Sequence, residues 1–155
     1  MKKLRAVSDA SILIHLSAIG RFHLLMDLFQ EIVIPEGVYE EVVVEGWGLP
    51  GSLETAEAIR SGFIAVKGVV DREEVRNIIR KYNNAEVIQL AKEMNAEVVL
   101  ADEEEVREEA EERGFDVRGS PAALSFDDIH KCRCLRYIYM RRGEKEHGGR
   151  KDAKP

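Results

Sequence analysis

Apolar residues in the first 120 positions follow two patterns: short continuous runs, and longer stretches in which they recur every three or four residues. A short run bounded by turn residues predicts a buried strand, whereas the longer spacing predicts an amphipathic helix. The predicted strands are residues 4–8, 31–35, 63–66 with 69–70, 97–101 and 115–117. The predicted helices are residues 12–19, 22–28, 36–43, 53–60, 71–82, 85–94 and 103–113. This alternation predicts a three-layer α/β fold, in which a parallel sheet of four to five strands is flanked by helices.

The alternation of strands and helices stops near Ser120 and Pro121. We therefore divide the chain into a domain over residues 1–120 and a diverged basic C-terminal tail over residues 121–155. Residues 131–155 hold nine Lys and Arg against three acids, a net charge of +6, which leaves −12 for residues 1–130 out of a total of −6. The tail fits either a phosphate-binding arm or a solvated end. An acidic body repels a polyanion unless cations bridge the two, which favours a metal-dependent protein.

Composition places the chain among globular proteins, with 45% hydrophobic and 34% charged residues. No apolar run approaches the ~18 residues of a membrane helix, and the N-terminus lacks the apolar region of a secretory signal. Two cysteines, Cys132 and Cys134, form no disulfide framework, so we expect a cytoplasmic protein without a membrane. Together with His130 they fall short of the four ligands of a structural zinc site.

Two carboxylates follow predicted strands directly, Asp9 after residues 4–8 and Asp102 after residues 97–101. Ligands of open α/β sheets bind beyond the carboxyl ends of the strands. Carboxylates that converge there repel one another unless a hard divalent cation binds between them. Such a cation polarises a phosphoryl oxygen and lowers the pKa of a bound water, so the pattern favours phosphodiester hydrolysis.

The segment VSDASILIHLSAIGRFHLLMDLFQEIVIPEGVYEEVV resembles the opening of PIN domains, most closely those of a PIN-like subfamily without an assigned function. In that pattern a strand ends in D-x-S, and V-x-x-E follows a later strand and Pro. The resemblance implies that Asp9 is the first acid of the site, Ser11 its neighbouring hydroxyl and Glu41 its second acid.

A later segment, NNAEVIQLAKEMNAEVVLADEEEVREEAEERGFDVRG, resembles the G-E-x-E-A helix of the same family and the Asp-ended strand after it. The resemblance implies further metal ligands at Glu86 and Asp102. The first glutamate of the helix motif is Asn84 here, a neutral ligand with less charge for Mg²⁺. Whether Glu86 replaces it depends on where the helix starts, because residues i and i+2 do not share a helix face.

The family implies a VapC-like endoribonuclease that binds Mg²⁺ or Mn²⁺ at Asp9, Glu41, Glu86 and Asp102, with Asp9, Glu41 and Asp102 as the catalytic residues. Ser11 and Asn84 are accessory candidates. The implied substrate is single-stranded RNA. The implied partners are a second copy in a homodimer and, for a toxin of the VapC type, an inhibitory antitoxin.

Several alternatives stay open at this point. A catalytically weakened PIN fold could serve as a nucleic-acid or protein binding module. A nucleotide-binding or phosphoacceptor domain is disfavoured, because no phosphate-binding glycine motif follows the first strand. Asp102 could cap the next helix, Glu41 alone would be an ordinary surface residue, and the glutamates of residues 104–112 read as a solvated helix face. His15, His23 and His147 lack recognisable catalytic partners, so the interpretation of His15 and His23 is structural.

Overall fold

The computed structural model describes residues 3–78 and 82–119, and these contain one five-stranded parallel sheet. The strand order is β3-β2-β1-β4-β5. The strands are β1 (Leu4–Ser8), β2 (Phe29–Pro35), β3 (Ile64–Lys67), β4 (Val98–Leu100) and β5 (Asp116–Arg118). The prediction of an α/β fold with four to five parallel strands is confirmed.

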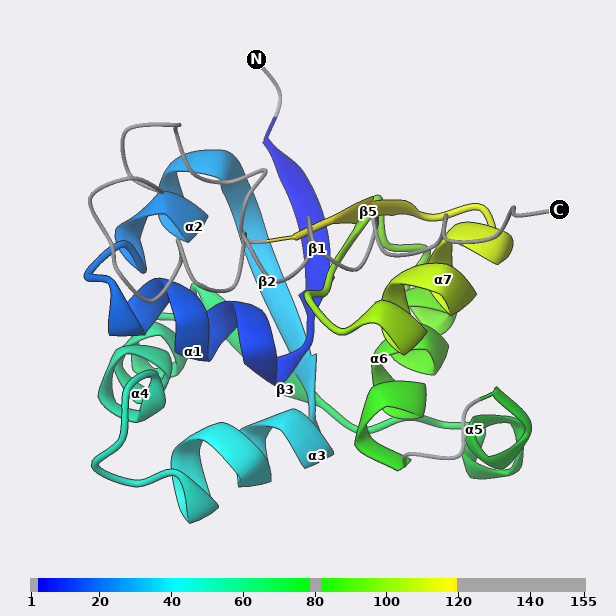
Figure 1. Cartoon of the computed structure of the whole chain (residues 1–155), viewed down its shortest axis with the longest axis horizontal. Coiled ribbons are helices and arrows are strands. Elements are labelled where there is room, and N and C mark those ends of the chain that lie inside the picture. The colour runs from blue at the N-terminus through cyan, green and yellow to red at the C-terminus, as the bar shows by residue number, and fades with distance from the viewer. Residues whose placement is uncertain (1–2, 79–81, 120–155) are drawn as a thin grey trace, which may run out of the picture. The chain divides into compact units, whose positions relative to one another are not determined.

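The helices lie in two layers, one on each side of the sheet (Figure 1). The first layer holds α1 (Ala10–Ala18), α2 (His23–Leu28) and α4 (Ser52–Arg60). The second holds α5 (Arg72–Ile78), α6 (Tyr82–Glu93) and α7 (Glu104–Glu112), with α6 packed across β1, β2 and β4. A short helix, α3 (Glu36–Tyr39), continues into the π-helical segment η1 (Glu40–Glu45) after β2. Within the part of the chain that the structure describes, no helix is long and apolar enough to cross a membrane.

The central strand β1 pairs with β2 on one side and with β4 on the other. The chain moves outward from β1 to β3, then crosses back to β4 and moves outward to β5. Connections therefore diverge at the carboxyl ends of β1 and β4, the switch point where open α/β sheets bind ligands. The register pairs Val7 with Val99 and Ser8 with Leu100, so the residues after both strands emerge side by side.

The core follows from the apolar runs of the sequence. The middle strands bear side chains buried on both faces of the sheet, as expected of a parallel sheet with helices on either side. The largest fully buried residues include Ile12, Leu13, Leu16, Leu25, Ile32, Ile34, Ile64, Ile88 and Leu90. The site is therefore built on a rigid base.

Several element boundaries differ from the prediction, and one of them affects the site. Helix α6 begins at Tyr82, whereas the predicted helix begins at Ala85, so Asn84 lies inside the first turn. The predicted helix of residues 71–82 corresponds to α5, which the structure describes over Arg72–Ile78. Val69 and Val70 follow β3 without joining it.

The basic tail of residues 121–155 lies outside the described residues, and so do His147 and the cluster of His130, Cys132 and Cys134.

Candidate active site

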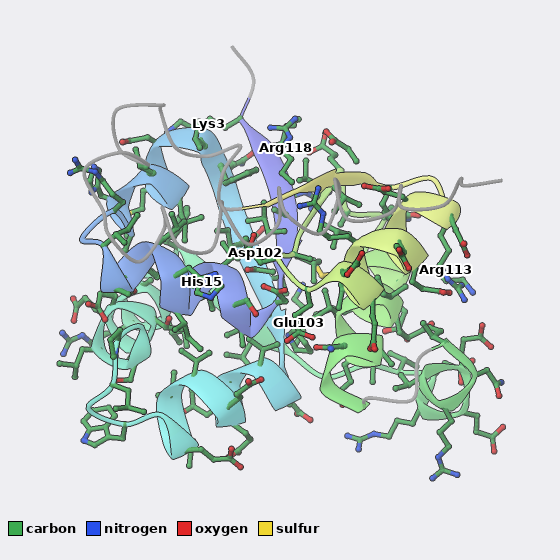
Figure 2. All side chains as sticks on the ribbon, viewed as in Figure 1. Lys3, His15, Asp102, Glu103, Arg113 and Arg118 are labelled. Carbon is green, nitrogen blue, oxygen red and sulfur yellow. The ribbon has the colours of Figure 1, made fainter. Side chains whose placement is uncertain are left out.

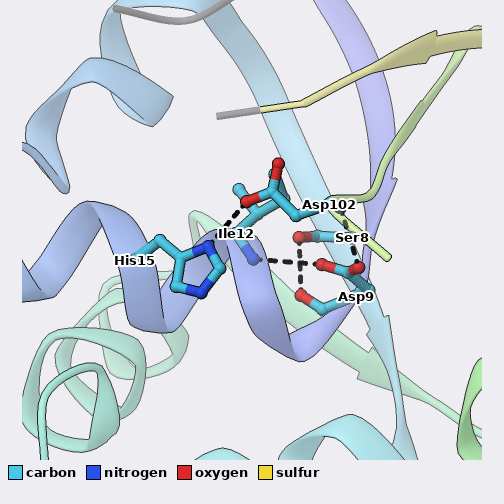
Figure 3. A network of polar contacts seen from close by, with 5 residues as sticks. All are labelled: Ser8, Asp9, Ile12, His15 and Asp102. Carbon is cyan, nitrogen blue, oxygen red and sulfur yellow. Dashed lines mark hydrogen bonds and ion pairs between the residues drawn. The ribbon is translucent and has the colours of Figure 1, made fainter. Parts of the chain in front are cut away.

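Asp9 emerges from the carboxyl end of β1 and is almost fully buried. It caps α1, because its Oδ1 accepts a hydrogen bond from the Ile12 amide at 3.0 Å. Its Oδ2 accepts a second bond, at 3.1 Å, from the amide of Asp102 (Figure 3). The Asp9 carboxylate therefore caps α1 and also ties the end of β1 to the segment after β4.

Asp102 follows β4 with one residue between them and is also buried. The prediction that it caps α7 is wrong, because the N-cap of that helix is Glu103. The Asp102 Oδ2 atom instead lies 2.7 Å from Nδ1 of His15 on α1. A Cβ atom placed on Gly119 would lie 2.9 Å from the other carboxylate oxygen, Oδ1. His15 therefore holds one carboxylate oxygen, and the other lies near the backbone of Gly119.

His15 on α1 has a partner that the sequence interpretation did not identify. The sequence shows no partner for it, yet the fold brings it against a carboxylate 87 positions later (Figure 3). Ser11 lies one helical turn before His15, so the two side chains share a face of α1. Ser11 is half-buried.

Glu103 is the residue that the sequence interpretation missed. It is half-buried beside Asp102 (Figure 2), and its Oε2 accepts a hydrogen bond from the Asn84 side-chain amide. Its negative charge also raises the pKa of Asp9 and the pKa of Glu41. Glu103 thus lies between the strand-end carboxylates, Asn84 and Glu41. The only available sequence signal was its position directly after Asp102.

Glu41 and Glu86 approach from helices. Glu41 is exposed in η1, where partial desolvation first, then the charges of Glu103 and Glu45, raise the pKa of its carboxyl. Glu86 is buried on α6, and its Oε2 accepts a hydrogen bond at 3.1 Å from the Gly37 amide in the first turn of α3. Asn84 and Glu86 thus bond to different parts of the molecule.

Burial, more than the neighbouring charges, determines the electrostatics of Asp9. Burial raises its pKa from 3.8 to about 7, because the ionised carboxylate loses its hydration. The Ile12 amide opposes this rise, while the charges of Asp102 and Glu103 add to it. The site therefore concentrates negative charge that a nearby cation would stabilise.

The donor chemistry can be compared with what a metal requires. The candidate donors are carboxylate and amide oxygens, which suit a hard divalent cation such as Mg²⁺ or Mn²⁺. Within residues 3–78 and 82–119, no three His, Cys, Asp or Glu side chains are grouped closely enough to hold an ion. The chemistry of the donor set fits the ion, although the described side chains do not form a closed coordination shell.

Comparisons with known proteins agree with this fold and with the resemblance of the sequence to PIN domains. A family model described as a PIN domain matches residues 5–124. No curated protein matches the chain significantly. A solved structure described as a domain of a functionally unknown protein from Methanocaldococcus jannaschii DSM 2661 is similar, with 21% identity and a TM-score of 0.50. The match covers 75% of this chain and 90% of that one, and at this identity it supports the fold alone. Because the family model spans most of its length, the chain belongs to the PIN-domain family.

Proposed function

We propose that this PIN domain is a Mg²⁺- or Mn²⁺-dependent endoribonuclease acting at the carboxyl ends of β1 and β4. The observation that carries the proposal is the junction of Asp9 and Asp102 at the switch point of the sheet, where the Asp9 carboxylate accepts a hydrogen bond from the Asp102 backbone amide. The raised pKa of Asp9 supports it, because buried carboxylates at such a cost are a feature of functional sites.

The residues that would hold the cation are Asp9 and Asp102, with Glu103, Asn84 and Glu41 at the border of the site. A bound cation would polarise a phosphoryl oxygen and lower the pKa of a water. Asp9 and Asp102 would supply charge from a fixed backbone, since both follow paired strands. Glu86 already bonds the first turn of α3, so we assign it to holding that helix in place of a ligand role.

The decisive experiment incubates purified protein with labelled single-stranded RNA in Mn²⁺, Mg²⁺ or EDTA. We expect cleavage with either metal, none in EDTA, and none with Asp9→Asn, which keeps the side-chain volume but removes the charge. Asp27→Asn is the matched control, because Asp27 is exposed on α2. This variant should cleave RNA as the wild type does. Absence of cleavage with metal, or equal cleavage in EDTA, would overturn the nuclease proposal.

A second candidate is a PIN-fold binding module that has lost catalysis. The observation in its favour is Asn84, a neutral amide in place of the family glutamate, which donates its hydrogen bond to Glu103. Calorimetric titration with Mn²⁺ separates the two candidates, because a module without a site should bind no ion. Asn84→Glu should raise affinity and cleavage if the position lies at the site. A gain of neither would show that Asn84 does not contribute.

We extend the proposal to protein partners of this domain: a second copy in a homodimer and, in a toxin, an antitoxin. Supporting it are exposed apolar residues on η1, on α4 and in the turn between them, namely Val44, Trp47, Leu49 and Leu53. Sedimentation velocity of wild type and Trp47→Asp tests the homodimer. A wild-type monomer at micromolar concentration would contradict it.

A further inference from the structure

The contact between His15 and Asp102 connects segments that belong to opposite sides of the sheet. His15 lies on α1, which covers one side of the sheet, and Asp102 lies on the segment that leads from β4 into α7 on the other. Nδ1 and Oδ2 are 2.7 Å apart, a short distance typical of a charge-assisted hydrogen bond. The His15 side chain is 30% exposed and that of Asp102 only 6%, so a partly exposed ring contacts a nearly buried carboxylate.

The direction of this hydrogen bond follows from its partners. An ionised carboxylate only accepts hydrogen bonds, so with Asp102 ionised Nδ1 carries the proton and donates it to Oδ2. Imidazole also has a fixed ring, and α1 is anchored at its first turn by Asp9 itself. The Asp9 carboxylate therefore helps to place the helix that carries the donor to Asp102.

The opposite side of the Asp102 carboxylate leaves little freedom. A Cβ atom on Gly119 would meet both Oδ1 of Asp102 and Nη1 of Arg107 at 2.9 Å. The backbone at Gly119 thus lies against Oδ1 while the His15 ring holds Oδ2. Rotation of the carboxylate requires breaking the bond to His15.

We infer that His15 is a positioning residue, whose Nδ1–H orients the Asp102 carboxylate for cation binding. This inference rests on the proposed function of the site. Hydrogen bonds from groups behind metal ligands orient the ligands, and their loss costs about 10- to 100-fold in metal affinity. The role requires the hydrogen bond and not the charge of the imidazole ring.

Three substitutions separate the hydrogen bond from the bulk of the side chain. In His15→Asn, Nδ2 stands at the same number of bonds from Cβ as Nδ1 of histidine, so the donor is retained. His15→Gln moves the amide one bond further away, and His15→Leu removes the donor. His23→Leu is the matched control, because His23 is exposed on α2. The readout is the Kd for Mn²⁺ by calorimetry, with circular dichroism to verify folding and RNA cleavage in parallel.

We expect the Kd of the Leu and Gln variants to rise about 10- to 100-fold, while the Asn variant and the His23 control stay near wild type. If the Leu variant fails to fold, the comparison of Asn with Gln carries the test. An unchanged Kd in Gln and Leu, or an equal loss in Asn, would overturn the inference while leaving the nuclease proposal standing. A wild type that binds no Mn²⁺ would overturn both.

Discussion

Two groups of acidic side chains approach the carboxyl end of this sheet, and the fold holds them by different means. The strand-end pair, Asp9 and Asp102, follows β1 and β4 and is joined through backbone hydrogen bonds. The positions of the helix-borne acids, Glu41 and Glu86, depend on how η1 and α6 are rotated about their axes. The register of the parallel strands fixes the positions of Asp9 and Asp102, whereas the rotation of each helix decides what Glu41 and Glu86 contact. The strand-end pair is therefore the stable centre of the site, and the surrounding residues vary in role.

The largest expected difference between the two groups is in catalysis. Asp102→Asn should lower RNA cleavage on the order of 1000-fold, because the cation that would stabilise charge in the transition state loses a charged ligand. Glu86→Gln should change cleavage only a few-fold, since its amide oxygen can still accept the Gly37 amide. Single-turnover cleavage at saturating Mn²⁺ measures both. A comparable loss in the two variants would show that Glu86 belongs to the catalytic group.

The pH dependence of stability in metal-free protein is the next largest effect. The pKa of Asp9 is 3.8 when unfolded and about 7 when folded, so the folded protein binds more protons between these values. Stability should therefore fall as pH rises from about 4 to about 7, by on the order of 4 kcal/mol. Above that window Asp9 is ionised in both states and adds no further slope.

Urea denaturation in EDTA at several pH values measures this slope. Asp9→Asn should flatten it, because the titrating group is gone, whatever its effect on absolute stability. Mn²⁺ added at pH 7.5 should raise the free energy of unfolding of the wild-type protein but not that of Asp9→Asn. A wild-type stability that is constant or rises across the window would contradict the electrostatic account of the site.

The sequence predicted the strand-end pair for a physical reason. A short apolar run followed by Asp is a local signal, and parallel pairing brings the ends of such runs together without further information. This reasoning identified Asp9 and Asp102 as strand-end residues, and the apolar pattern predicted the alternation of strands and helices along the chain.

The residues around the pair depend on distances that no local pattern contains. His15 reaches Asp102 across 87 positions. Glu103 is the first residue of the predicted helix over residues 103–113, whereas in the structure it is the N-cap of α7 and lies beside the site. Helix α6 begins three residues before the predicted start, which sets the phase that sends Asn84 to Glu103 and Glu86 to Gly37.

A smaller effect is expected from crowding the strand-end pair. Gly119→Ala would place Cβ against Oδ1 of Asp102 and Nη1 of Arg107, and the buried carboxylate has little room to move. We expect cleavage to fall about 10- to 100-fold, as for other small displacements of reacting groups. Gly68→Ala is the control, since its Cβ would meet only the exposed Glu36 carboxylate. Equal activity in both variants would show that Asp102 tolerates displacement.

The smallest expected effect concerns the helix-borne side of the comparison. The N-cap residue of α3 is Pro35, which offers no side-chain cap, and Glu86 supplies an acceptor to Gly37 from α6 instead. Glu86→Ala should therefore lower the free energy of unfolding by about 1 kcal/mol, as the loss of a helix cap does, and Glu86→Gln by less. Glu108→Ala, on the exposed surface of α7, is the matched control for urea denaturation. Unchanged stability of Glu86→Ala with a large loss of Mn²⁺ affinity would show that Glu86 binds the cation and does not merely cap α3.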